Sequence, residues 1–413
     1  MERDTSAPQR APDWDPRGPE TFDSSHPVYS EIRGRCPVAW SEAFGGFWAV
    51  LKYDDIVRVT EDAGGFITSV QNTVPGIPRA ERRPPLHIDP PEHRRYRAPL
   101  NQVFRKSVVR RLEPAFRAAA GDLLDAMLER GGGDFSREFA LPYAAGCFAA
   151  MLDLPVGLML RTREIGVRYS FAIQDMDREG VRRTSEELYA VAGEIFDLVK
   201  AADRDPATDM VASLLAATRD ADEPITERSV VSTIRQIIVA ATGATHAVLG
   251  SCAVHLARDA ALQDRLRSDP GLVPAALEEF LRLYSPYRVF ARTATRDVTI
   301  RGREIRAGEA VALIFPSGNR DEEHFDDPHG FRLDRRPNRH IAFGRGAHAC
   351  VAAPMARLEL RVALEEVLAR TSSFALSGEV EMFNWLEFGP VATPLAMAPH
   401  SRRTAPAPGD HRR

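Results

Sequence analysis

The sequence predicts a mainly α protein with a minor β region, which places the fold in the α+β class. Apolar residues recur at helical spacing through most of the region from about residue 90 to 285. Alternating strand patterns dominate only after residue 285, and a last helical pattern begins at residue 353. A helix share well above average, combined with a small sheet, is typical of an α-rich α+β fold.

The elements of the first half follow in chain order. Residues 45–53 predict a short strand after a glycine turn, and residues 54–62 predict a helix. The Gly- and Pro-rich residues 64–91 have no clear period, and 90–104 open a helix with prolines at its start. A further amphipathic helix is predicted at 112–130.

Two more amphipathic helices are predicted at 186–202 and 273–285. Strands follow at 297–300, 303–305 and 309–315. A loop-rich stretch over 316–340 leads to a Gly- and Cys-containing segment, and 353–370 return to helix.

Composition indicates a globular protein with a large core. Of 413 residues, 44% are hydrophobic, with 28 Gly and 30 Pro, which excludes fibrous and mostly disordered proteins. One domain is expected over residues 23–398, because neither a repeat nor a flexible linker divides that sequence. The charged ends, 1–22 and 399–413, are expected to be disordered tails.

Charge and cysteine usage narrow the class of partner. The formal net charge of −4 does not indicate a nucleic-acid-binding protein. Four widely spaced cysteines without a C-x-x-C pair, and an N-terminus without an apolar secretory segment, fit a protein of the reducing cytoplasm. Residues 236–257 carry no formal charge and are long enough to span a bilayer, but their scattered polar side chains favour a buried helix and no membrane.

The most specific motif is Phe343-Gly344-x-Gly346-x-His348-x-Cys350, placed immediately before a helix. The reactive form of cysteine is the thiolate, which a helix N-terminus and backbone N–H groups stabilise. Two glycines let the backbone turn sharply and approach a flat ligand. A lone cysteine in a glycine turn is usually inert, so the other motifs in the sequence decide whether Cys350 is a functional residue.

The motif resembles the haem-binding loop of the cytochrome P450 superfamily, and the resemblance extends over about residues 25–398. It implies haem b (iron protoporphyrin IX) as the cofactor, lying between a long I helix and the Cys loop with its L helix. Cys350 would be the catalytic, metal-binding residue that ligates iron. The other implied haem contacts are Phe343, Gly344 and Gly346 in the loop, and His93, Arg97, Arg292 and His348 at the propionates.

Another part of the resemblance is structural. Glu279 and Arg282 match the E-x-x-R motif of the family's K helix, and Arg335 matches the arginine that engages this pair. The resemblance implies that the three residues lock the core on the haem side and take no part in catalysis.

The uncharged stretch resembles the family's I helix but departs from its A-G-x-[DE]-T pattern. Gly243 stands at the acid and Ala244 at the threonine, a pair that helps to deliver protons during dioxygen activation. Thr245 or Thr242 after a helix distortion, or substrate hydroxyls and water, could replace that pair, or the chemistry could need radical formation only. His246 is expected to be a core histidine. Ala352 replaces a family glycine, and we expect haem binding to be retained.

The family's specificity segments imply a substrate pocket. Their apolar and polar mixture indicates a medium-sized secondary metabolite of aromatic or heterocyclic character. The implied pocket residues are Phe66, Val70, Gln71, Val239, Ala240, Gly243, Val289, Phe290, Leu386 and Phe388.

We therefore expect hydroxylation of a small organic substrate with dioxygen and electrons from a ferredoxin and its reductase. A basic patch around the proximal face would attract such an acidic donor. One alternative is oxidative C–C or C–N coupling, dimerisation or ring closure without oxygen insertion, and another is a non-catalytic helical binding protein. The expected patch consists of Arg94, Arg95, Arg105, Lys106, Arg110, Arg111, Arg345, Arg357 and Arg361.

Overall fold

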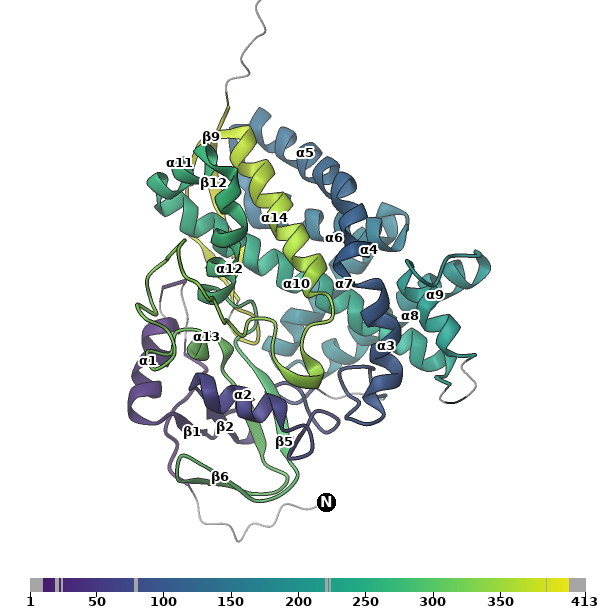
Figure 1. Ribbon diagram of the computed structural model, residues 1–413, viewed down its shortest axis with the longest axis vertical. Coiled ribbons are helices and arrows are strands. Elements are labelled where there is room, and N and C mark those ends of the chain that lie inside the picture. The colour runs from purple at the N-terminus through teal and green to yellow at the C-terminus, as the bar shows by residue number, and fades with distance from the viewer. Residues whose placement is uncertain are drawn as a thin grey trace, which may run out of the picture.

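The computed structural model describes residues 10–18, 22–23, 25–77, 81–219, 222, 224–383 and 385–400, without the side chains of Gln174 and Thr242. Helices make up most of the molecule, and the largest sheet lies at one side of it (Figure 1). The mainly α, α+β class that the sequence predicts is confirmed.

The first part of the chain contributes short strands and then a series of helices. In order these are α1 (Ser25–Arg35), β1 (Val38–Ser41), η1 (Ala43–Gly45), β2 (Phe47–Val50), α2 (Tyr53–Glu61), β3 (Phe66–Ile67), α3 (His93–Val103), α4 (Lys106–Val109), η2 (Arg110–Leu112), α5 (Glu113–Glu129), β4 (Gly132–Asp134), η3 (Phe135–Ala140), α6 (Leu141–Leu152), α7 (Val156–Gln174), α8 (Arg178–Ala201) and α9 (Met210–Ala217).

The second part begins with the longest helix and returns to strands twice. Its elements are α10 (Glu227–Arg258), α11 (Ala260–Ser268), η4 (Pro270–Leu272), α12 (Val273–Leu283), β5 (Phe290–Ala294), β6 (Val298–Ile300), β7 (Arg303–Ile305), β8 (Ala310–Leu313), α13 (Phe315–Gly318), η5 (Gly346–His348), α14 (Ala353–Arg370), β9 (Thr371–Leu376), β10 (Glu381–Met382), β11 (Pro390–Ala392) and β12 (Pro394–Pro399).

The largest sheet joins segments that are far apart in the sequence. Its strand order is β1-β2-β8-β5-β3, with β8 parallel to β2 and antiparallel to β5. In this register Val311 lies opposite Trp48 on one side and Arg292 on the other. The pairing holds the segment after α12 beside the N-terminal strands, and β5 thereby becomes one wall of the cavity described below.

Helix α10 runs through the interior. It begins where the Thr226 hydroxyl accepts a hydrogen bond from the N–H of Ser229, an N-cap that satisfies an otherwise unpaired donor. The helix is long and apolar enough to cross a membrane by length and composition, yet 65% of its apolar stretch is buried against the other helices. This packing is that of the core helix that the sequence favours over a membrane span.

The chain ends lie closer to the core than the sequence predicts. Asp13, within the expected tail 1–22, exchanges backbone and side-chain hydrogen bonds with Trp40 at 2.8 Å, and Trp14 packs against Tyr29. The expectation of a disordered tail is therefore wrong for residues 10–18, because an aromatic side chain there completes the core. Of the expected tails, residues 1–9, 19–21 and 401–413 lie outside the described residues.

Candidate active site

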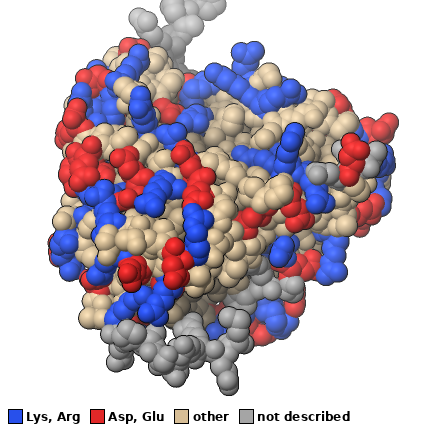
Figure 2. Space-filling view, turned by 60° about the horizontal axis from the view of Figure 1, so that its bottom comes forward, with Lys and Arg blue, Asp and Glu red and all other residues tan. Residues whose placement is uncertain are grey.

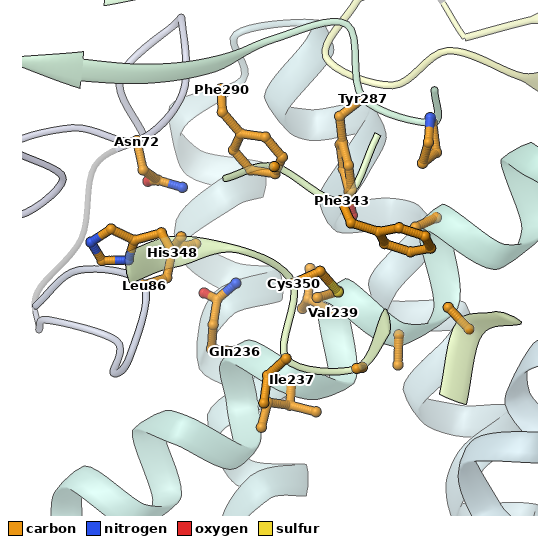
Figure 3. Close-up of a pocket in the computed structure, with 18 of the residues that line it drawn as sticks. Asn72, Leu86, Gln236, Ile237, Val239, Tyr287, Phe290, Phe343, His348 and Cys350 are labelled. Carbon is orange, nitrogen blue, oxygen red and sulfur yellow. The ribbon is translucent and has the colours of Figure 1, made fainter. Parts of the chain in front are cut away.

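The loop that carries Cys350 is closed by a backbone hydrogen bond. The N–H of Cys350 donates to the carbonyl oxygen of Phe343 at 2.8 Å. Gly344 and Gly346, between them, both have φ of +69°, a conformation that side chains with a Cβ rarely adopt. Phe343, Gly344 and Cys350 all line the adjacent cavity (Figure 3).

Gly346 needs to be glycine for a reason that the sequence does not reveal. A Cβ at this position would lie 2.2 Å from the carbonyl oxygen of Thr60, in α2. The prediction that Gly346 contacts a flat ligand is therefore wrong, because this glycine lies outside the cavity lining. Its role is to let the loop pack on α2.

Cys350 and α10 line the same cavity. It measures about 340 Å³, counted as the space open to the centre of a water molecule, and its walls are mostly apolar. The exposed surface of Cys350 faces this cavity, whose lining includes Val239 of α10 and Phe290 of β5 (Figure 3). The space is therefore bounded by a sulfur atom, an apolar helix and a strand.

The environment of the Cys350 thiol contains opposing influences. Burial raises its pKa, whereas the backbone N–H of Ala352 and the guanidinium of Arg97 lower it. The N–H group at the start of α14 thus acts as the sequence predicts, because it favours the thiolate. A full negative charge on the sulfur calls for a cation in the cavity beside it.

Arg97 and Arg292 line the cavity near the Cys350 loop and have no acidic partner within ion-pair distance among the described residues. Arg292 is 5% exposed, and its Nη1 donates to the carbonyl oxygen of Ala291 at 2.8 Å. Burial lowers the pKa of Arg292 to about 10 and also lowers the pKa of Arg97. Among the described residues no carboxylate forms an ion pair with either one. Enclosed cations of this kind require anionic groups of a ligand.

The two predicted histidines lie beside these arginines in different ways. His348 lines the cavity, and its Nε2 lies 3.3 Å from the Thr68 hydroxyl and 3.8 Å from Asp89 Oδ1. His93 does not line the cavity, since its ring packs edge-on against His348 with centroids 4.6 Å apart. The expected direct ligand contact of His93 is therefore replaced by a supporting position behind His348.

The part of α10 facing the cavity carries small side chains. Val239, Ala240 and Ala244 line the cavity, as predicted for the first two. Thr245 also lines it, but its hydroxyl donates to Glu359 Oε2 at 2.9 Å. The side chain of Thr242 lies outside the described residues. His246, expected in the core, is buried beside Phe383, and burial lowers its pKa to about 4.

An acid from another segment lies where α10 has none. A Cβ at Gly243 would lie 3.0 Å from Glu387 Oε1, so this carboxyl occupies the space that an acidic side chain of residue 243 would need. Ser170 donates to Glu387 Oε1 at 3.5 Å, while the buried Oε2 has no partner among the described residues. Burial raises the pKa of Glu387 to about 7. Gly243 itself does not line the cavity, whereas Glu387 does.

Besides Gly243, four residues expected in the substrate pocket lie outside the cavity lining. Phe66 pairs with Ala294 in the sheet and packs in its core. Val70 is 56% exposed, and the Gln71 amide donates to the carbonyl oxygen of Thr73. Phe388 is fully buried under the Arg288 guanidinium. These predictions are wrong because the chain turns these side chains away from the cavity, whereas Val289, Phe290 and Leu386 line it as expected.

The structure brings the predicted structural triad together. Arg282 donates to both carboxylate oxygens of Glu279, at 2.8 and 2.6 Å, and Arg335 Nε donates to the same carboxylate at 3.1 and 3.2 Å. Arg282 also donates to the carbonyl oxygens of Asn319, Pro328 and Gly330. The ion pair is completely buried and ties α12 to the loop before Cys350.

Arg83, Arg235 and Glu359 line the cavity but are not predicted by the sequence. A charged residue is by default expected in solvent, which hides such positions. Arg235 could have been found from the sequence, because it directly precedes the uncharged stretch that predicts a buried helix. Glu387 has a similar signal, since it stands between two residues assigned to the pocket.

Comparisons with known proteins agree with this geometry. A sequence model of the cytochrome P450 family matches residues 271–383. Mycinamicin IV hydroxylase/epoxidase of Micromonospora griseorubida is 32% identical, over 84% of this chain and 89% of its own. Cyclomarin C epoxidase of Salinispora arenicola is 30% identical, over 86% of this chain and 88% of its own.

Solved structures show the same similarity. A cytochrome P450 from Chondromyces apiculatus superposes with a TM-score of 0.83 and 29% identity, covering 94% of this chain and 99% of that one. Relatives named hydroxylases, epoxidases and monooxygenases leave no support for a non-catalytic binding protein. The chain belongs to the cytochrome P450 family and is a haem-thiolate oxidoreductase.

Proposed function

We propose that the protein hydroxylates a small secondary metabolite of aromatic or heterocyclic character, using dioxygen and external electrons. The observation that carries this proposal is the cavity itself, which Cys350 lines together with small side chains of α10 and with Arg97 and Arg292, neither of which forms an ion pair among the described residues. The names of relatives that hydroxylate or epoxidise mycinamicin IV and cyclomarin C support an oxygen-inserting reaction.

The residues present fit a haem. The Cys350 sulfur would hold the iron, and Arg97, Arg292 and His348 would neutralise the two propionates. The fit rests on the chemistry of the donors: one thiol faces the cavity, and the partly buried Arg97 and the buried Arg292 form no ion pair among the described residues. When bound, haem supplies the redox centre at which dioxygen is activated.

The protein's own side chains shape the rest of the cavity. Ala240 and Ala244 leave room for a substrate, and Val289, Phe290 and Leu386 exclude water from it. Burial raises the pKa of Glu387 to about 7 and that of Glu359 to about 8, so both carboxyl groups can hold a proton near neutral pH. We assign to these two acids the proton-holding role that Gly243 and Ala244 cannot perform.

Oxidative coupling is the second candidate function, and one observation favours it. Among the described side chains of α10 from Val239 to Thr245, none offers a free hydroxyl, because Ala244 has none and Thr245 donates to Glu359. In this alternative, hydrogen abstraction from the substrate is followed by formation of a C–C or C–N bond without oxygen insertion.

Product analysis under oxygen-18 gas separates the two functions. The holoenzyme is supplied with a ferredoxin, its reductase and a compound selected by its shift of the haem absorption band. Hydroxylation predicts a product that gains one labelled oxygen atom. A product that has lost two hydrogen atoms, or a dimer without the label, would replace the first proposal by the second.

We further propose a cytoplasmic location and a ferredoxin as electron donor. Exposed cations on and between α3, α4 and η2 support an acidic donor, and α4 packs against α14, the helix that follows Cys350. Part of the expected basic patch is neutralised, since Arg357 pairs with Glu278 and Arg361 pairs with Glu113. The exposed cations that remain are Arg94, Arg105, Lys106, Arg110 and Arg111.

A further inference from the structure

Two arginines from distant parts of the chain meet inside the cavity. Arg83 is 3% exposed and Arg235, in α10, is 0% exposed, and both line the cavity. Arg83 Nη1 donates to the Tyr169 hydroxyl at 3.0 Å, and the Arg235 guanidinium lies 4.5 Å from the centroid of the same ring. Nη2 of each arginine donates to the Ser185 hydroxyl at 3.4 Å. Because they share Tyr169 and Ser185, the two guanidinium groups are neighbours.

No opposite charge accompanies this pair. Within the part of the chain that the structure describes, neither guanidinium forms an ion pair, and the Nε atoms of Arg83 and Arg235 are buried without a hydrogen-bond partner. Glu81 is engaged elsewhere, with Arg228 and Ser232. Two buried like charges without an anion are costly for the fold, so their presence calls for a function.

The neighbouring groups respond to this excess of positive charge. Burial raises the pKa of the Tyr169 phenol, but the guanidinium groups of Arg235 and Arg83 outweigh burial and lower that pKa overall. Burial is also the largest cause that lowers the pKa of Arg235, and the charge of Arg83 adds to it. An anion placed between the two arginines would relieve both effects.

We propose that Arg83 and Arg235 bind a carboxylate of the substrate, so that the enzyme acts on organic acids. A carboxylate is planar and accepts paired N–H bonds from a guanidinium, and the two unpaired Nε–H groups are the donors available here. This inference rests on the proposed function, because it names the substrate class for the same cavity.

The position of the arginines also limits the shape of the acid. Along α10, the rise from Arg235 to Ala244 is about 13 Å at the usual helical pitch. The cavity lining between these two residues begins with Gln236, next to Arg235, and continues with the apolar Ile237, Val239 and Ala240 (Figure 3). The substrate that fits has a carboxylate at one end and an apolar body that extends toward the Cys350 side.

Matched acids and neutral esters test the proposal on the haem-loaded enzyme. The probes are dodecanoate, 4-phenylbutanoate and their methyl esters. Binding is measured twice, by titration of the haem absorption band and by the ligand-induced rise in melting temperature, which needs no haem signal. The variants are Arg235→Gln and Arg83→Gln, and Arg228→Gln is the matched control because Arg228 is an exposed arginine of the same helix.

We expect the wild-type enzyme to bind at least one acid about tenfold or more tightly than its ester. Each cavity variant should lose about ten- to hundredfold in affinity for that acid, with the affinity for the ester unchanged. Arg228→Gln should retain the wild-type preference. If one variant does not fold, the other variant and the wild-type comparison decide.

Two results would overturn the proposal. One is a wild-type enzyme that prefers no acid to its ester. The other is a pair of variants that weaken acid and ester equally, which would mean that the arginines serve packing only. Failure of the proposed function has a different signature, because the product would then carry no labelled oxygen atom while the melting temperatures still report acid binding.

Discussion

At the scale of single residues, burial sets the protonation chemistry of the cavity. Glu359 is 5% exposed and accepts a hydrogen bond from Thr245, and Glu387 lies against Gly243 with one carboxylate oxygen unpaired. Neither acid forms an ion pair among the described residues, so desolvation raises the pKa of both carboxyl groups. Glu387, from the segment between β10 and β11, thus lies against Gly243, and Glu359 of α14 lies against Thr245 of the same helix.

Glu359 makes stability depend on pH in a defined direction. Its folded-state pKa of about 8 lies above the ordinary value of 4.5, so the folded protein holds this proton more tightly. The stabilisation is complete below pH 4.5 and is lost as the pH rises through about 8, at about 1.4 kcal/mol per pH unit. Glu359→Gln should remove this slope from urea-unfolding free energies measured across the same range.

The control for that experiment is Glu129→Gln, at the exposed end of α5. This variant should retain the wild-type slope, because its carboxyl group is in solvent. Equal slopes for wild type and Glu359→Gln would contradict the assignment of a protonated, buried Glu359.

The closeness of Glu387 to Gly243 predicts a coupled pair of substitutions. Gly243→Asp would place a second carboxyl beside Glu387 Oε1, where a Cβ alone already lies at 3.0 Å. We expect Gly243→Asp to lower the melting temperature, and more at pH 8 than at pH 6, because both acids ionise at the higher pH. Adding Glu387→Gln should remove most of the difference between the two pH values. Independent, additive effects would show that the two side chains do not meet.

At the scale of elements, local motifs were predictable and strand pairing was not. The Cys350 loop and the Glu279–Arg282 pair of α12 are recognisable because each motif lies within one short segment. The prediction that Phe66 lines the pocket is wrong because the direction of its side chain depends on strand pairing with Ala294, which is far along the chain. The prediction that Phe388 lines the pocket is wrong because the backbone turns at Leu386, whose φ is +66°. A leucine in the sequence does not indicate such a turn.

The triad of Glu279, Arg282 and Arg335 predicts a large stability loss on disruption. Glu279 is completely buried, and Arg335→Ala would leave its carboxylate with one guanidinium fewer. Removing a partner from a buried ion pair costs about 3–5 kcal/mol. We expect a loss of that order in the free energy of unfolding by urea, and Arg332→Ala, at an exposed pair with Asp334, should cost under about 1 kcal/mol. Similar losses for the two variants would contradict the structural role.

At the scale of the whole molecule, positive and negative side chains are mixed over the surface, apart from a local group of exposed cations on α4 and η2. Lys and Arg are interspersed with Asp and Glu on the face that Figure 2 shows. The net charge of −4 gives the molecule no strong overall field. In the proposed function, attraction of an electron donor would therefore depend on the exposed cations of α4 and η2, and α4 packs against the helix that follows Cys350.

That dependence predicts a salt-sensitive electron transfer. The rate of haem reduction by an acidic ferredoxin should fall as ionic strength rises, because added salt screens the attraction. The double variant Lys106→Glu and Arg110→Glu should lower the rate at low salt by about tenfold or more. Arg265→Glu, an exposed residue of α11, is the charge-matched control and should not change it. A rate that is indifferent to salt and to these variants would exclude this docking surface.

The central claim is that Cys350 holds a haem as a thiolate in the cavity below α10. The most direct test is the absorption spectrum of the purified, reduced protein under carbon monoxide, for wild type and Cys350→Ala. We predict the strongly red-shifted carbonyl band of a thiolate-ligated haem in the wild type, and its loss in the variant. A folded, haem-supplied wild type without that band, or a Cys350→Ala variant that keeps it, would contradict the claim.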